Sequence, residues 1–221
     1  MNLVIDLTEI LDNTKNALVE HGNHRYEMPA KIGVYPYPEV FYHAMPAFEP
    51  GMIAVGCKWI ECYPNNPEKF GLPQTTGLMI INDVESGVPL AIMDSAWVNA
   101  MRTPAVAILS AAELHPGAET FGIFGCGVQG KEHIKYAAEA LSELKKVYVY
   151  DNREAAADAL IDELRSEVPF TLIKGKGPEI ARCGDKYMVD SIEEHEIVEQ
   201  MGYFSAGLAS IAAETGILLT L

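Results

Sequence analysis

The sequence predicts an α/β protein whose second half contains a parallel sheet, and two observations lead to this fold class. From about residue 118 onward, short apolar runs alternate with segments of helical periodicity, an order typical of βαβ units. Upstream, residues 26–60 alternate extended runs with Pro and Gly, and two apolar runs at 77–83 and 88–94 flank a polar turn that ends in Gly87. We therefore expect antiparallel strands followed by a parallel sheet.

Helices are expected on both sides of these strands. Residues 3–21 carry apolar side chains at helical spacing. A helix starts or is renewed around residues 102–104 and continues to residue 114, because Thr103 and Pro104 suit an N-cap and a first helical position; this would place Arg102 beside a helix N-terminus. Further elements are expected as helices over 158–165 and 192–200 and as strands over 170–173 and 186–189.

The most specific motif is GCGVQG at residues 125–130, which fits the pattern GxGxxG. It follows the apolar run 120–124 and precedes a helical segment and a β-branched run, 146–150, that ends at Asp151. The glycines of such a loop provide a tight turn, a close approach to a pyrophosphate and helix–strand packing, while the helix start donates N–H groups to phosphates. The complete order of strand, glycines, helix, strand and acid predicts a dinucleotide site.

Asp151 bears on which dinucleotide is bound. A carboxylate about 20 residues beyond the glycines accepts hydrogen bonds from the ribose hydroxyls, which favours NAD over NADP. Arg153, two residues later, could instead attract a 2′-phosphate. NAD is therefore the expected cofactor, with NADP as the alternative.

Four side chains outside this loop are candidate site residues. Arg102 is either a clamp for a carboxylate or phosphate, or a solvated arginine in a turn. Lys58 lies in the apolar run 52–60, where a lysine either snorkels to the surface or is desolvated, with a lowered pKa that suits proton transfer or substrate contact. Lys31 is a site cation or an exposed strand lysine, and His43 is a proton donor or a buried histidine with its hydrogen bonds satisfied.

Composition limits the function classes. The net charge of -15 over 221 residues argues against a nucleic-acid partner, because a phosphate backbone requires clustered Lys and Arg. The four cysteines form no CxxC pair, so we expect no metal site and a reducing compartment. There is no basic leader and no apolar run of about 18 residues. We therefore expect no membrane partner and a cytoplasmic location.

Five blocks in this order resemble the ornithine cyclodeaminase and mu-crystallin family. Over roughly residues 28–151 they are KWI at 58–60, DVESG at 83–87, PLAIMD at 89–94, MRT at 101–103 and GCGVQG at 125–130. The pairing of the Arg-Thr block with GxGxQG is fairly specific, because ordinary dehydrogenases lack the glutamine and the upstream block. The resemblance implies a homodimer in which a Rossmann-type parallel sheet domain joins an α/β dimerisation and substrate domain.

The resemblance also implies domain limits and residue roles. The expected domains are 1–104 for dimerisation and substrate, 105–203 for NAD binding, shortened near 174–178, and a truncated C-terminal segment over 204–221. Lys58 would be catalytic and would contact the substrate, Lys31 would take the place of the family's carboxylate-binding arginine, and Arg102 would bridge substrate and cofactor phosphate. The other cofactor-binding residues would be Thr103, Gly125, Gly127, Val128, Gln129, Asp151, Asn152 and Arg153.

The reaction implied first is the cyclodeamination of ornithine. Hydride leaves the α-carbon for NAD, the side-chain amine attacks the resulting imine, ammonia departs, and NADH reduces the cyclic imine to proline. The alternatives are an alanine-type amino acid dehydrogenase or a ketimine reductase, all with small amino acid substrates. A non-catalytic dinucleotide-binding relative is the third possibility.

One departure from the family motivates this last alternative. Beyond residue 173 the chain passes through residues 174–178 into a segment that resembles the one after the family's catalytic aspartate, and no residue matches that aspartate. The small residue that normally follows the Arg-Thr pair is replaced by Pro104. We therefore expect either that a segment is missing or that this is a shortened relative with impaired chemistry.

Overall fold

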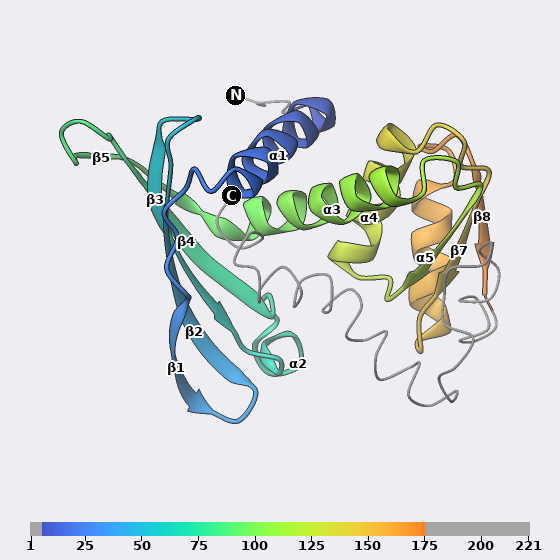
Figure 1. The fold of residues 1–221 in the computed structure, drawn as a ribbon. Helices are drawn as coiled ribbons and strands as arrows, with labels where there is room; N and C mark the ends of the chain where they lie inside the picture. The colour runs from blue at the N-terminus through green and yellow to red at the C-terminus, as the bar shows by residue number, and fades with distance from the viewer. Residues whose placement is uncertain (1–5, 176–221) are drawn as a thin grey trace, which may run out of the picture. The chain divides into compact units, whose positions relative to one another are not determined.

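The computed structural model describes residues 6–175, which form two compact units (Figure 1). One unit contains residues 13–99, and the other contains residues 6–12 and 100–175. The helix α1 (Leu7–Gly22) confirms the expected N-terminal helix. Within these described residues, no helix is both long and apolar enough to cross a membrane. The elements expected over 186–189 and 192–200 lie outside the described residues.

The unit of residues 13–99 is built on a five-stranded antiparallel sheet in which each strand pairs with the next in the chain. The turn between the last two strands confirms the expected hairpin: Asp83 Oδ1 accepts a hydrogen bond from the Ser86 N–H at 2.7 Å, and Gly87 has a φ of 74°. The short helix α2 (Asn66–Phe70) is an element that the sequence did not indicate. The strands are β1 (Ile32–Tyr37), β2 (Val40–Glu49), β3 (Ala54–Cys62), β4 (Thr75–Asn82) and β5 (Pro89–Asp94).

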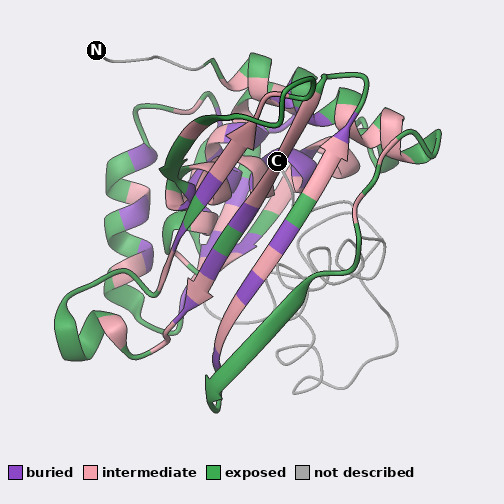
Figure 2. Ribbon diagram, turned by 90° about the vertical axis from the view of Figure 1, so that its left-hand side faces the viewer, coloured by how far each residue is buried: buried purple, intermediate pink, exposed green. Residues whose placement is uncertain are grey.

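Strand register assigns alternate residues to the two faces of this sheet, which Figure 2 shows coloured by burial. One row crosses all five strands and consists of Ile32, Ala44, Trp59, Leu78 and Asp94. We call the face that carries this row the outer face. Its large apolar side chains are exposed, Ile32 by 71% and Trp59 by 41%. The inner face carries the next row and is largely buried.

The unit of residues 6–12 and 100–175 confirms the expected parallel sheet. Its three strands are ordered β6-β7-β8, all parallel, and the connecting helices pack on them. Apolar residues of strands and helices, including Val147, Ile134 and Leu164, are fully buried in one core, as is usual for a sheet built from βαβ units. The elements are β6 (Thr120–Phe124), α4 (Val128–Ala140), β7 (Lys146–Tyr150), α5 (Glu154–Leu164) and β8 (Thr171–Lys174).

The helix α3 (Ser95–Leu114) corrects the sequence prediction, because it begins at Ser95 and contains Pro104 in its interior. The cause is Asp94, whose Oδ1 accepts hydrogen bonds from the N–H groups of Ala96 at 2.6 Å and Trp97 at 3.4 Å. This is the geometry of an N-cap. Arg102 therefore lies within a helix, and the interpretation that it stands beside a helix N-terminus is wrong.

The cap at Asp94 gives a testable prediction. Asp94→Ala should lower the free energy of unfolding by about 1 kcal/mol, because two N–H groups of the first turn lose their acceptor. Asp94→Asn should lower it much less, since an asparagine oxygen can cap equally well. Urea denaturation of the three proteins measures the difference, and equal stability of Asp94→Ala and the unchanged protein would contradict the role of this side chain.

Candidate functional site

The glycine-rich loop joins β6 to α4 with the geometry that its sequence predicts. Gly125 has a φ of 93°, a conformation that favours glycine, and its N–H donates to the Tyr150 carbonyl at 2.8 Å. A Cβ on Gly130 would stand 2.0 Å from the Gly125 carbonyl oxygen, so only glycine permits this close packing of helix and loop. A Cβ on Gly127 would meet nothing within 4 Å, which leaves open space in front of the backbone. The loop therefore fits a pyrophosphate.

The start of α4 offers further groups to an anion. Gly127 is the N-cap residue, with extended backbone, and no side chain caps the helix. Val128 and Gln129 form the first turn, and the Val128 side chain is exposed. Backbone N–H groups at such a helix start bind phosphate oxygens.

Asp151 ties the end of β7 to the glycine loop. Its Oδ2 accepts a hydrogen bond from the Cys126 N–H at 2.8 Å, and its Oδ1 accepts one from the Arg153 N–H at 2.9 Å. Burial alone would raise the pKa of this carboxyl, but these two hydrogen bonds and the Arg153 charge hold the pKa below its usual value. The carboxylate is therefore ionised and suited to accept hydrogen bonds from ribose hydroxyls. Asn152 and Arg153 follow it, and Arg153 is the N-cap residue of α5.

Arg102 belongs to the same unit as the glycine loop and has a buried head group. Its Nε and Nη1 atoms are buried and have no hydrogen-bond partner within residues 6–175, and burial lowers the pKa of Arg102 to about 10. The guanidinium is therefore still charged at neutral pH. Buried donors without partners are rare in proteins, and an anionic ligand would satisfy them. Thr103 is the next residue of α3.

Lys58 lies on the inner face of the five-stranded sheet and is 1% exposed. The interpretation that it snorkels to the surface is therefore wrong. Its Nζ donates a hydrogen bond to Asn99 Oδ1 at 2.8 Å, and its neighbours across the strands are Met45 and Met79. Sequence reasoning missed Asn99, because its position on the first turns of α3 becomes visible only when the helix is known to begin at Ser95.

Lys31 and His43 lie near Lys58 on the same sheet. Lys31 is exposed and immediately precedes β1, whose Gly33 pairs with His43. Burial lowers the pKa of His43 most, and the positive charges of Lys31 and Lys58 lower it further. The structure thus brings two sequence-predicted cations to one region of the inner face.

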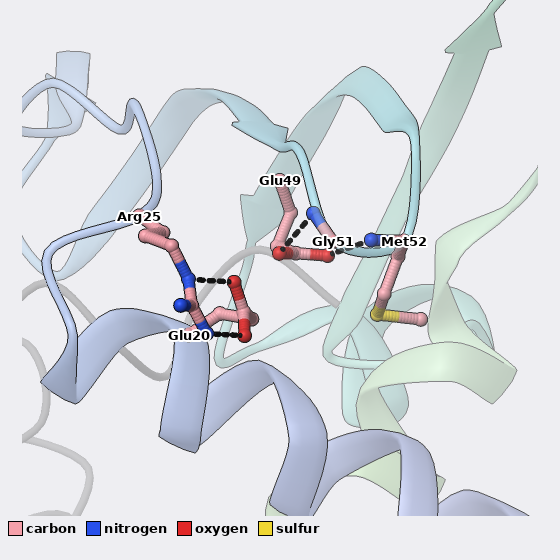
Figure 3. A network of polar contacts seen from close by, with 5 residues as sticks. All are labelled: Glu20, Arg25, Glu49, Gly51 and Met52. Atoms are coloured by element: carbon pink, nitrogen blue, oxygen red, sulfur yellow. Dashed lines mark hydrogen bonds and ion pairs between the residues drawn. The ribbon is translucent and has the colours of Figure 1, made fainter.

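A cavity of about 170 Å³ adjoins Lys58 between α1 and the sheet. Most of its wall is apolar, including Phe48, Val55 and Met79, and Glu49 lines it as well. The Glu49 carboxylate accepts hydrogen bonds from the N–H groups of Gly51 at 2.9 Å and Met52 at 2.6 Å (Figure 3). The lining of this cavity therefore combines Lys58 and Glu49 with apolar residues.

Beside Glu49 stands the ion pair of Arg25 and Glu20, in which Arg25 Nε donates to a Glu20 oxygen at 2.6 Å (Figure 3). The hydrogen bond from Arg25 to Glu20 is the largest cause of a raised pKa of Arg25, and the Glu49 charge contributes as well. Arg25 is thus paired with Glu20, and the Glu49 carboxylate is a second negative charge that acts on it.

A glycine loop with a carboxylate at the end of the next strand defines a dinucleotide-binding α/β protein, and the unit of residues 13–99 adds a buried lysine next to a cavity. Comparison with known proteins defines the group more closely. The chain belongs to the ornithine cyclodeaminase/mu-crystallin family, whose sequence pattern matches residues 2–183.

Three relatives illustrate this membership. The nodulation efficiency protein NfeD of Rhizobium meliloti is 31% identical over 192 residues, which are 86% of this chain and 59% of NfeD. The Thermococcus litoralis Δ1-pyrroline-2-carboxylate reductase, solved with NADH and L-proline, has a TM-score of 0.77 at 25% identity, covering 83% of this chain and 57% of that one. An archaeal alanine dehydrogenase dimer with bound NAD has a TM-score of 0.74 at 28% identity, covering 80% and 54%.

This chain therefore spans between half and three fifths of the length of these relatives. The two solved relatives hold NAD or NADH, which agrees with the cofactor that Asp151 predicts.

Two glycines of the loop should respond differently to the same change. Gly127→Ala should leave the free energy of unfolding nearly unchanged, because its Cβ has open space, but should weaken NAD binding at least tenfold by occupying the place of the pyrophosphate. Gly130→Ala should instead lower the free energy of unfolding by about 1–3 kcal/mol, because its Cβ collides with backbone. Urea denaturation and calorimetric titration with NAD separate the two effects. Unchanged NAD affinity in Gly127→Ala would show that the pyrophosphate lies elsewhere.

Proposed function

We propose that this chain is part of an NAD-dependent enzyme that transfers hydride between the α-carbon of a small amino acid, or of its imine, and the nicotinamide. The observation that carries this proposal is the buried Lys58, a cation held inside a sheet of a chain that also has a complete dinucleotide loop. Bound NAD would supply the hydride acceptor. The functional domains proposed for the protein are 1–104, 105–203 and 204–221.

The substrate-binding residues proposed are Lys31, Lys58 and Arg102. The ammonium groups of Lys31 and Lys58 would bind the substrate carboxylate as point charges, without the two parallel hydrogen bonds that an arginine makes. Lys58 would also lie next to the imine nitrogen. There its positive charge would disfavour protonation of the imine. The unsatisfied guanidinium of Arg102 would bind the carboxylate and a cofactor phosphate.

The proposed cofactor site follows from the loop geometry. Gly125, Gly127, Val128 and Gln129 would hold the pyrophosphate, and Asp151 the ribose hydroxyls. Thr103, Asn152 and Arg153 would complete the site.

Cyclodeamination of ornithine is the first specific reaction proposed. It requires room for a four-atom side chain and a polar partner for the distal amine, whereas an alanine-type enzyme would close the pocket on a methyl group. The cavity beside Lys58 provides the room and Glu49 provides the carboxylate, which supports the first reaction. Dehydrogenation or imine reduction is the second candidate, supported by the activities that the names of the two solved relatives state.

The proposed assembly is a cytoplasmic homodimer that pairs through the outer face of the five-stranded sheet. Exposed large apolar side chains on one face of a sheet, here Ile32, Trp59 and Leu78, are typical of a contact surface. The archaeal alanine dehydrogenase is described as a dimer, which makes a second copy of this chain the partner that fits best. No nucleic-acid or membrane partner is proposed.

The proposed function is tested by turnover and by one matched pair of variants. With L-ornithine, L-alanine or L-proline and NAD, at least one substrate should give product, and Lys58→Met should reduce kcat/KM roughly 10- to 100-fold, because a charged hydrogen-bonding group to the carboxylate is lost. NAD affinity should stay within about twofold, since Lys58 is in the other unit from the glycine loop. Lys69→Met, at an exposed position of α2, is the control and should behave as the unchanged protein.

The products distinguish the candidate reactions. Ammonia released without accumulation of NADH would indicate cyclodeamination, and stoichiometric NADH would indicate dehydrogenation. NAD binding without turnover of any of these substrates would contradict the enzymatic proposal and favour a non-catalytic relative.

A further inference from the structure

His43 lies on the inner face of β2 in a slot that fixes its ring. The residue is 7% exposed, and its imidazole stacks on Phe41 with ring centroids 4.2 Å apart. A Cβ on Gly33, the residue opposite on β1, would stand 2.4 Å from His43 Cδ2, so the absence of a side chain there makes room for the ring. The orientation of the imidazole is thus set by its neighbours.

One ring nitrogen of His43 is engaged and the other is not. Nε2 lies 3.1 Å from the Tyr35 hydroxyl oxygen. Within residues 6–175 the hydrogen bond of the His43 ring is the one that Nε2 makes to Tyr35. Because Nε2 contacts the Tyr35 hydroxyl, Nδ1 is the ring nitrogen that can contact a ligand.

The charges around His43 determine what that ligand can be. Lys31 and Lys58 are the charged groups that act on the ring, and Tyr35 is its other titratable neighbour. Because burial and the two ammonium groups lower the pKa of His43, the imidazole is neutral at neutral pH. When Tyr35 donates its hydroxyl proton to Nε2, the proton of the neutral ring is on Nδ1. Since the charges of Lys31 and Lys58 act on this ring, an anion is the favourable acceptor for that N–H.

We propose that His43 is a further substrate-binding residue, which donates a hydrogen bond from Nδ1 to the carboxylate that Lys31 and Lys58 hold. The inference rests on the proposed function, because it takes the ligand of the two lysines to be an amino acid carboxylate. Tyr35 is then a positioning residue, since it acts through the imidazole. The site would bind α-amino carboxylates and discriminate against the corresponding amides.

A pair of amide substitutions separates the two ring nitrogens. In His43→Asn the amide nitrogen reaches the position of Nδ1, and in His43→Gln it reaches the position of Nε2. His43→Gln should raise KM for the amino acid that the enzyme turns over, chosen from L-ornithine, L-alanine and L-proline, roughly tenfold. His43→Asn should stay within about threefold of the unchanged protein. Both should keep kcat and the affinity for NAD nearly unchanged.

Two further measurements exclude a merely structural role. Tyr35 is largely exposed, so Tyr35→Phe should preserve thermal stability and yet raise KM, because the ring loses its orientation. In NMR titrations of the NAD-saturated protein, L-alanine should raise the pKa of His43, since a bound carboxylate favours the imidazolium, and L-alaninamide should not.

The outcomes of these experiments are distinct. Equal KM values for His43→Gln, His43→Asn and the unchanged protein, with normal turnover, would overturn the role of His43 and leave the proposed function intact. Absence of turnover and of amino acid binding in the unchanged protein would overturn the proposed function and this inference with it. If His43→Gln lowered the affinity for NAD as much as it raised KM, His43 would have a structural role and the proposed contact with the carboxylate would be overturned.

Discussion

The burial of Lys58 is the constraint on which the unit of residues 13–99 depends. An ammonium group removed from water is costly unless it is paired and hydrogen-bonded, so its surroundings must supply partners. Asn99 supplies one of them, and it can do so only because Asp94 starts α3 directly after β5. The strand, the cap and the first turns of the helix therefore act together to hold one cation. Burying the Lys58 ammonium group costs free energy, and desolvated charges of this kind cluster at functional sites. We therefore interpret its burial as a sign of function.

The period of the sheet explains how one face buries Lys58 while the other exposes large apolar side chains. Adjacent residues of a strand point to opposite faces, so Trp59 lies exposed on the outer face while Lys58 lies buried on the inner face. A shift of one residue in the register would exchange them. The antiparallel pairing is fixed on both sides of β3, by β2 and by β4, which keeps Lys58 between Met45 and Met79.

Much of the parallel unit could be predicted because its signals are local. The glycines, the helix that follows and Asp151 are adjacent in the sequence or one βαβ unit apart, and the backbone demands at Gly125 and Gly130 admit only glycine. Of the two alternatives at residues 102–104, a helix start is wrong, because α3 begins at Ser95; Thr103 and Pro104 resemble a helix start, whereas the capping Asp94 comes at the end of an apolar strand. The burial of Lys58 and the contact of Tyr35 with His43 depend on the register between neighbouring strands, which a single sequence does not specify.

The central claim is that hydride passes between the α-carbon of an amino acid and NAD. Incubating the protein with NAD and L-ornithine or L-alanine deuterated at the α-carbon, followed by mass spectrometry of cofactor and product, tests it most directly. The account predicts deuterium at C4 of the nicotinamide, or at C2 of proline if the label is returned in cyclodeamination. Products whose α-carbon carries hydrogen from water, with no label in NADH, would contradict the account.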